Sequence, residues 1–162
     1  MDEKQSATLI VDTREPQRGG WDSYFQTPVI RGTLKTGDYS VLGHENSIAV
    51  ERKELGDLIS CLTSSRSRFE RELVRSRDLD FFCVICEGTY RQLFDGLYRS
   101  KMNSKAAWES VATFEVRYKI PFYFMGSPEL AALKCQSLLL KYWREQQKSE
   151  SKKQNGQGEL NG

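Results

Sequence analysis

Six consecutive apolar residues, Phe81-Phe82-Cys83-Val84-Ile85-Cys86, occupy the middle of the chain. A run of this length matches a β-strand, and a strand that is apolar at every position has no face to present to water. Such a strand must be covered on both sides. The run therefore predicts a central strand in a sheet that lies between two layers of helices.

The segments around this run predict the other elements. Short β-rich segments at 7–11, 29–34, 39–42 and 47–53 precede it. The closeness of the last three in sequence favours a meander, in which 39–42 and 47–53 are joined by a turn at 43–46. Helical periodicity is found at 55–62, 67–79, 105–118 and 128–147, and 121–125 predicts one more strand. In 67–79, Phe69, Leu73 and Val74 form one apolar stripe, and Asn103 or Ser104 is placed to cap the helix that follows. The expected fold is α/β, with a mixed sheet flanked by helices.

Length and composition indicate one globular domain. The chain has 162 residues, of which 38% are hydrophobic and 28% charged, and this is enough to bury a single core. We expect an N-terminal extension at 1–6, a domain at 7–147 and a disordered polar tail at 148–162, because the tail contains one leucine and no aromatic residue. The formal net charge of +2 neither indicates nor excludes a nucleic-acid partner.

No signal peptide or membrane-spanning run is present in the sequence, so we expect an intracellular, cytoplasmic protein without a membrane partner. The four cysteines have irregular spacing, which favours reduced thiols over disulfides. Cys83 and Cys86 form a lone C-x-x-C inside the apolar run, where core packing is a better interpretation than zinc binding.

Acidic residues gather at the ends of the predicted strands. Asp38 begins one strand, and Glu51 and Lys53 lie two apart on the next, so both side chains face the same side, with Arg52 opposite. If the two strands pair as a hairpin, Asp38 and Glu51 meet at one end of the sheet, beside Asp12 and Glu15.

Converging carboxylates repel each other unless a cation lies between them. Oxygen ligands suit Mg²⁺ or Mn²⁺, whereas a zinc site rich in histidine is impossible because His44 is the one histidine of the chain. Such a metal, with Lys53 beside it, fits phosphodiester hydrolysis. Spacing alone leaves a second interpretation open, in which Glu51, Arg52 and Lys53 are a solvated strand end and Asp38 is a turn residue.

Three segments together closely resemble the nuclease signature of the ERCC4/XPF family, written GDXnERKX3D. They are Val11-Asp12-Thr13-Arg14-Glu15, then Gly37-Asp38-Tyr39, then Val50-Glu51-Arg52-Lys53 followed after three residues by Asp57. The resemblance extends from about residue 8 to residue 145, and segments 67–73, 82–87 and 99–103 are similar to bacterial and phage members.

The resemblance implies a restriction-endonuclease-like three-layer sandwich. It also implies a metal-dependent DNA endonuclease that acts on branched or flap-like DNA in repair or recombination. By this resemblance the metal ligands are Asp38, Glu51 and the backbone carbonyl of Arg52, and Lys53 is the catalytic lysine. The remaining positions of the signature have auxiliary catalytic roles and are Asp12, Arg14, Glu15 and Asp57.

Members of this family that select DNA junctions usually carry a tandem helix-hairpin-helix module, and this chain has a short polar segment in its place. Besides DNA, the partners that we expect are therefore a second copy of the chain in a homodimer or a separate targeting protein. Two alternatives stay open: a non-catalytic DNA-binding or partner-docking subunit of the same fold, and a restriction-type nuclease that reads sequence.

Basic residues follow the acidic cluster along the chain, as DNA phosphates beside a negative centre require. We expect DNA contacts from Arg66 and Arg99 and count Arg68 and Lys101 as further candidates. The competing interpretation is a solvated helix face, supported by possible pairs of Arg66 with Glu70 and Arg68 with Glu72.

Overall fold

The computed structural model describes residues 6–159. Six strands form one sheet in the order β2-β1-β3-β4-β5-β6. Their bounds are β1 Leu9–Asp12, β2 Val29–Gly32, β3 Tyr39–Val41, β4 Ile48–Lys53, β5 Phe81–Cys86 and β6 Phe122–Phe124. Strand β5 lies between β4 and β6 and is paired in parallel with both, so the apolar run is an interior strand, as expected.

The pairing confirms the mixed sheet and the β3–β4 hairpin but not the meander. Strand β3 pairs antiparallel with β1 and with β4, whereas β2 pairs parallel with β1 on its outer edge. The expectation that β2 lies next to β3 is therefore wrong. The connection at 13–28 is long enough to return the chain to the start of β1, and it places Trp21 in the core, so a parallel pair replaces a hairpin.

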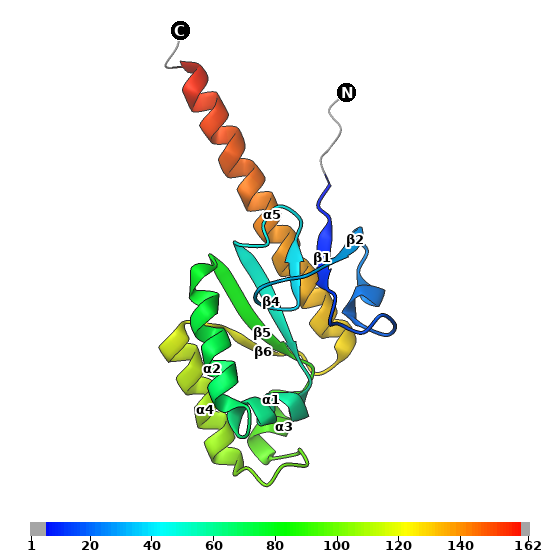
Figure 1. The fold of residues 1–162 in the computed structure, drawn as a ribbon, viewed down its shortest axis with the longest axis vertical. Coiled ribbons are helices and arrows are strands. Elements are labelled where there is room, and N and C mark those ends of the chain that lie inside the picture. The colour runs from blue at the N-terminus through cyan, green and yellow to red at the C-terminus, as the bar shows by residue number, and fades with distance from the viewer. Residues whose placement is uncertain (1–5, 160–162) are drawn as a thin grey trace.

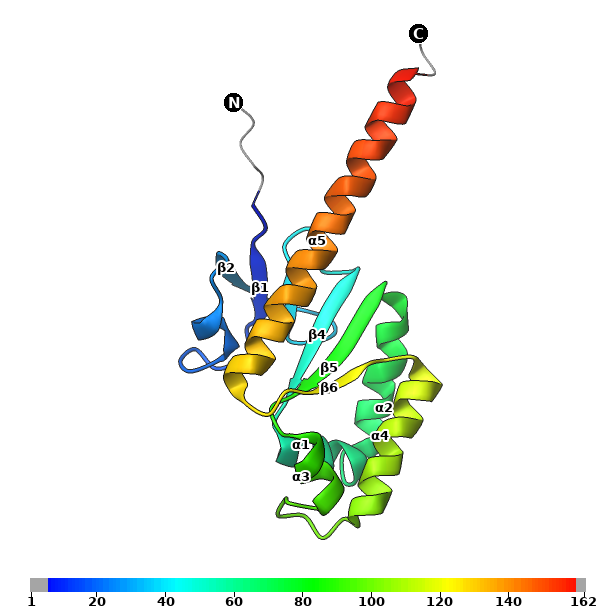
Figure 2. The same cartoon turned by 180° about the vertical axis from the view of Figure 1, so that it is seen from behind.

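Helices cover both faces of this sheet (Figures 1 and 2). Their bounds are α1 Leu55–Leu62, α2 Arg66–Arg75, α3 Tyr90–Asp95, α4 Ser104–Tyr118 and α5 Pro128–Glu159, with short 3-10 helices η1 Trp21–Tyr24 and η2 Ser76–Asp78. Helix α5 and η1 pack on one face, and α1, α2 and α4 pack on the other. These three layers confirm the expected α/β class. Helix α3 was not expected from the sequence.

Strand β5 shows why both layers are needed. Its residues Cys83 and Ile85 belong to the core under α5, and Phe82, Val84 and Cys86 belong to the core under α1, α2 and α4. The four cysteines of the chain are free and buried, as expected. Burial raises the pKa of Cys83 and of Cys86 to about 12, which supports packing over metal binding.

Helices α2 and α4 differ in how well their sequences predicted them. Asn103 caps α4 by accepting a hydrogen bond from the backbone N–H of Ala106 at 3.1 Å, as predicted. In α2, Phe69 and Leu73 are buried but Val74 is 48% exposed, so the expected apolar stripe is wrong at that position. The helix ends at Arg75 and gives way to η2, earlier than predicted.

The structure describes a helix over much of the segment for which a disordered tail is expected. Helix α5 continues to Glu159, so 148–159 is helical, and the side chains of 148–157 are exposed. A helix that is already nucleated extends cheaply through lysine, glutamine and glutamate. Residues 1–5 of the expected N-terminal extension and residues 160–162 of the expected tail lie outside the described residues. No helix within residues 6–159 is both long and apolar enough to cross a bilayer.

Candidate active site

The end of β4 divides the signature between the two faces of the sheet. Ala49 faces the core under α1, α2 and α4, and Val50 faces the core under α5. Because side chains alternate along a strand, Glu51 and Lys53 lie on the α1 and α2 side and Arg52 lies on the opposite side. The expected separation of Arg52 from its two neighbours is therefore confirmed.

Glu51 is a nearly buried carboxylate without enough polar partners. Its residue is 5% exposed, its Oε1 lies 3.7 Å from Lys53 Nζ, and its Oε2 has no hydrogen-bond partner among the described residues. Burial raises the pKa of this carboxyl well above its ordinary value, and the neighbouring Glu72 and Asp38 raise it further. A buried, unpaired oxygen of this kind is costly unless a proton or a cation binds to it.

Asp38 is fixed beside Glu51 by the backbone of the hairpin. Its N–H donates to the carbonyl of Val50 at 2.8 Å, and its Oδ2 accepts from the N–H of Arg52 at 2.8 Å. In an extended strand the N–H and C=O of one residue point to the same side, so the Arg52 carbonyl is also directed toward Asp38. The structure thus brings together the three groups expected to bind metal.

Lys53 is a half-buried cation at the edge of this group. Burial lowers its pKa, but the charge of Glu51 and the nearby Cys61, Glu72 and Asp38 outweigh that effect, so the net shift is upward. Its Nζ also lies 5.5 Å from the ring centroid of Phe69. Lys53 is therefore charged at neutral pH and held close to the carboxylates.

The donor set fits a cation that prefers oxygen ligands, such as Mg²⁺ or Mn²⁺, better than zinc or copper, which prefer nitrogen and sulfur ligands. Two carboxylates and one backbone carbonyl leave positions for water, which Mg²⁺ retains, and the unpaired Oε2 of Glu51 is an available ligand. Within residues 6–159, no three His, Cys, Asp or Glu side chains form a ready metal cluster. A cation in this place would therefore be bound by few protein atoms and would keep much of its water.

Asp12 and Arg14 lie at the end of β1 next to this group. Asp12 is fully buried and accepts hydrogen bonds from Arg14 Nε at 2.7 Å and from the N–H of Leu34 at 2.8 Å. Burial alone would raise the pKa of Asp12, but these bonds and the N–H of Arg14 lower it overall. The oxygens of Asp12 are thus used internally, whereas Arg14, with 69% of its side chain exposed, also experiences the charges of Asp38 and Glu51.

Glu15 and Arg52 belong to a polar cluster on the other face of the sheet. Arg52 Nε donates to Glu87 at 2.9 Å, and its Nη1 lies 3.7 Å from Glu15. Tyr39 donates to Glu15 at 2.8 Å, and the indole of Trp21 donates to Glu87 at 2.8 Å. Burial raises the pKa of Glu15 and Asp38 raises it further, against the hydrogen bond from Tyr39 and the charge of Arg52. This cluster fixes the end of β4 from the face of the sheet opposite to Glu51.

Two further carboxylates differ from expectation. Asp57 lies in the first turn of α1 and is exposed, without a hydrogen bond or ion pair to Asp38, Glu51 or Lys53. Glu72 was not expected, yet it lies beside Glu51 and raises the pKa of that residue. Its helical spacing from the buried Phe69, three residues earlier in α2, is the one signal in the sequence that places it on the inner face.

The four residues expected to contact DNA have different environments. Arg66 donates to Ser110 at 3.1 Å and its guanidinium lies 4.8 Å from the ring centroid of Phe114, so it fastens the start of α2 to α4. Arg68, Arg99 and Lys101 are exposed. Neither helix pair considered from the sequence forms, since Glu70 binds Arg117 instead and Arg68 makes no ion pair in the part of the chain that the structure describes.

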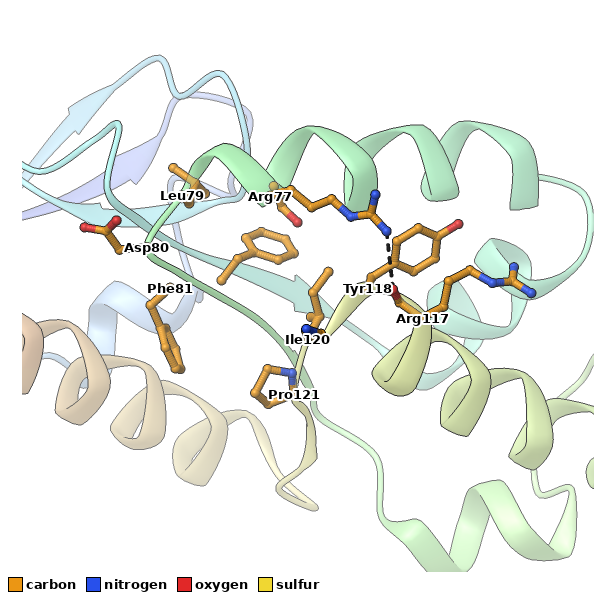
Figure 3. A pocket seen from close by; sticks show the side chains of 11 residues that line it. Arg77, Leu79, Asp80, Phe81, Arg117, Tyr118, Ile120 and Pro121 are labelled. Carbon is orange, nitrogen blue, oxygen red and sulfur yellow. Dashed lines mark hydrogen bonds between the residues drawn. The ribbon is translucent and has the colours of Figure 1, made fainter.

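A cavity of about 560 Å³ lies away from these residues, at the N-terminal ends of β5 and β6 (Figure 3). Arg77 lies 5.2 Å from the ring centroid of Tyr118 and donates to the carbonyl of Arg117. The acid at its rim, Asp80, accepts from Tyr142. Arg77 thus covers the C-terminus of α4, where a cation is favourable without any ligand. The lining shares no residue with the candidate active site, so the cavity is separate from it.

Comparison with known proteins identifies the family. The family model described as "ERCC4 domain" matches residues 11–136. The chain belongs to the ERCC4 domain family. The resemblance expected from the sequence is therefore confirmed. A search of curated proteins finds no match.

Solved structures share the fold. XPF from Aeropyrum pernix matches with a TM-score of 0.64 and 24% identity, over 82% of this chain and 59% of that chain. The same protein in a complex with DNA matches with a TM-score of 0.65 and 24% identity, over 87% of this chain and 66% of that one. This ERCC4 chain thus spans less than two thirds of the length of either match.

Proposed function

We propose that this ERCC4 domain is a divalent-metal-dependent DNA endonuclease, with Mg²⁺ or Mn²⁺ as its cofactor and branched or flap-like DNA as its substrate. The observation that carries the proposal is the unpaired, buried Oε2 of Glu51 beside Asp38 and the charged Lys53. Membership of the ERCC4 family and the shared fold with an XPF bound to DNA support it.

Each residue of the site has a distinct role in this proposal. Asp38, Glu51 and the Arg52 carbonyl would hold the cation, whose chemistry is to neutralise charge on the scissile phosphate and activate water. Lys53 places a compact positive charge next to the reacting phosphate and stabilises charge that develops there. Arg14, exposed and close to the carboxylates, contacts an adjacent phosphate.

The polar cluster of Arg52, Glu15 and Glu87 acts indirectly. Its members lie on the opposite face from Glu51, so they hold β4 and the Asp38 turn in place rather than touching DNA. Glu15 is therefore a positioning residue and not a metal ligand. Asp12, whose oxygens accept from Arg14 and Leu34, positions Arg14 for the phosphate. Asp57, exposed at the start of α1, lies outside the direct metal site.

Cleavage assays on forked, flapped, nicked and duplex DNA test the proposal. Glu51→Gln and Lys53→Met should each reduce the rate by about 100-fold or more, and EDTA should abolish it. Glu129→Gln and Lys141→Met, exposed on α5, are matched controls and should retain the full rate. Thermal unfolding with Mn²⁺ adds a second readout, since the cation should stabilise the unaltered protein and not Glu51→Gln.

Two outcomes would contradict the proposal. Cutting by folded Glu51→Gln at the rate of the unaltered chain would exclude this carboxylate from catalysis. If the protein binds DNA but cuts none of these substrates with either metal, the non-catalytic subunit considered from the sequence is favoured.

A further inference from the structure

A second cavity, of about 450 Å³, lies between the start of α1, which follows the motif strand β4, and the connection from α3 to α4. One wall is the start of α1, where Leu55 follows Lys53 by two residues. The other wall is the segment 97–100, which connects α3 to α4. This volume is within the range of pockets that bind small molecules and is sufficient for one nucleoside.

The lining of the pocket combines apolar and hydrogen-bonding groups. Leu55 and Leu97 provide an aliphatic surface in front of the buried Ile59, and Tyr98 adds an aromatic ring. Leu97 is 61% exposed, which is unusual for a leucine that serves only the core. Flat, partly apolar ligands such as DNA bases bind surfaces of this kind.

Polar groups complete the pocket around this apolar surface. Ser60, Gln92, Arg99 and Ser100 also line it. The carbonyl oxygen of Gln92 accepts from Thr89, whereas its amide group makes no hydrogen bond to the residues that the structure describes. That amide can donate to base edges, and the exposed Arg99 can bind the neighbouring phosphate. The hydroxyl of Ser60 donates to the carbonyl of Gly56 at 3.2 Å, so it can serve a ligand as an acceptor.

The segment that carries Tyr98 is held in one conformation by its own hydrogen bonds. The Tyr98 hydroxyl donates to the carbonyl of Met102 at 2.8 Å, and the N–H of Met102 donates to Ser100 Oγ at 3.1 Å. The N–H of Leu97 donates to the carbonyl of Gln92 at 2.9 Å. A wall fixed in this way loses little entropy when a ligand binds.

The opposite wall leaves room for a DNA strand. Gly56 lies in the first turn of α1, and a Cβ atom placed on it would contact nothing within 4 Å. The β5–α3 connection packs tightly against the core side of Leu55, as a Cβ atom placed on Gly88 would lie 3.0 Å from the Cβ atom of Leu55. The pocket is thus open toward solvent and closed toward the core.

We infer that this pocket holds one unpaired nucleotide of the DNA strand next to the scissile phosphate. The inference rests on the proposed endonuclease function and adds a specificity site to it. A base that is stacked and paired inside a duplex must first be flipped out to enter the pocket, which costs free energy that an unpaired nucleotide does not lose. The pocket therefore selects substrates with an unpaired nucleotide beside the cut.

The test compares an abasic substrate with an intact one. Removing the base next to the mapped cut should lower kcat/KM of the unaltered protein about tenfold or more. Ser60→Trp places a large side chain in the pocket from an exposed helix position. This variant should cut the intact substrate about as slowly as the unaltered protein cuts the abasic one, and it should show no further loss on the abasic substrate. Ser137→Trp, an exposed serine on α5, should behave like the unaltered chain.

A second pair of variants keeps the test independent of the folding of Ser60→Trp. Leu97→Ala should weaken cutting of the intact substrate, and Leu42→Ala, which is 50% exposed outside the pocket, should not. The inference would be overturned if folded Ser60→Trp still lost as much kcat/KM on the abasic substrate as the unaltered protein does, and if Leu97→Ala cut the intact substrate normally.

Binding in EDTA separates this inference from the proposed function. A labelled single-stranded oligonucleotide should bind Ser60→Trp about tenfold more weakly than the unaltered chain. If no DNA is cut under any condition but this difference holds, the pocket stands and the nuclease proposal fails. If DNA is cut and this difference is absent, the pocket inference alone fails.

Discussion

At the scale of single residues, neighbouring positions of β4 perform opposite tasks. Glu51 faces the α1 and α2 layer with an unsatisfied oxygen, whereas Arg52 faces the other side and is fully engaged by carboxylates. The strand therefore carries an electrostatic cost on one face and a satisfied ion cluster on the other. The ion pairs of Arg52 fix the backbone of β4, and this allows the fold to tolerate an unpaired carboxylate oxygen on Glu51 that is available to a metal.

Asp12 provides a residue-scale prediction about stability. Asp12→Asn replaces one carboxylate oxygen by an amide group, which cannot accept from both Arg14 and Leu34. We expect a loss of about 1 to 3 kcal/mol in the free energy of unfolding at pH 7. Urea denaturation measures it, with the exposed Asp95→Asn as a control that should change little.

The pH dependence of this loss has a definite sign. The pKa of Asp12 is lowered in the folded state from an ordinary value of 3.8. Its ionised form therefore stabilises the fold above about that pH, and the contribution is lost as the pH falls through the folded pKa. The difference between the unaltered chain and Asp12→Asn should shrink in acid, and a difference that grows there would contradict the assignment.

The sequence predicted which side chains of the candidate site lie together, because they belong to one local motif. Strand alternation and the hairpin were sufficient to bring Asp38, Glu51 and Lys53 together. Glu72 was missed because its proximity to Glu51 depends on how α2 packs on the sheet, a long-range contact that strand spacing does not contain. The packing of Arg66 on Phe114 was missed for a related reason, since it requires the position of α4. The DNA contact expected of Arg66 stays a prediction.

At the scale of elements, the β3–β4 hairpin depends on a glycine before Asp38. Gly37 has a φ of +80°, and a Cβ atom on it would lie 2.7 Å from that of Ala49. Gly43, in the turn of the same hairpin, has a φ of +89° with nothing within 4 Å. The two glycines thus share a left-handed backbone conformation and differ in the room that is available for a Cβ atom.

This pair gives an element-scale prediction. Gly43→Ala should cost about 1 to 2 kcal/mol of folding free energy, for the left-handed backbone alone. Gly37→Ala should cost more, because β3 must separate from β4, and it should also slow DNA cutting by displacing Asp38. Urea denaturation and cleavage rates measure both effects. Equal stability losses, or full cutting by Gly37→Ala, would show that the close packing does not position Asp38.

Elements were predictable where periodicity or a cap was strong. The apolar β5 and the Asn103 cap of α4 are examples. Helix α3 was missed because it has six residues and is defined by a capping box between Thr89 and Gln92 rather than by an apolar stripe. The position of β2 was wrong because pairing partners depend on the path of 13–28, which the sequence pattern does not determine.

At the scale of the whole molecule, the sheet separates two cores that meet in β5. The core under α5 includes Ala131, Cys135 and Leu139, whereas Lys53 extends over the other core toward Phe69. Beyond Trp143 the helix contributes no buried side chain up to residue 157 and projects away from the sheet (Figures 1 and 2). The support that α5 gives to the site must therefore come from its first half.

Truncation tests this division of α5. A chain ending at Gln147 removes side chains that are exposed throughout 148–157, so its free energy of unfolding should change by no more than about 0.5 kcal/mol and its DNA cutting should be retained. A chain ending at Ser137 also removes the buried Leu139, and loss of that side chain alone costs about 2 to 5 kcal/mol. Denaturation and cleavage assays on both chains check this. A solvated helix has no packing to lose. If the chain ending at Gln147 were less stable than the full chain by about 2 kcal/mol, which is the cost of a lost leucine, the outer half of α5 would have to pack against the domain.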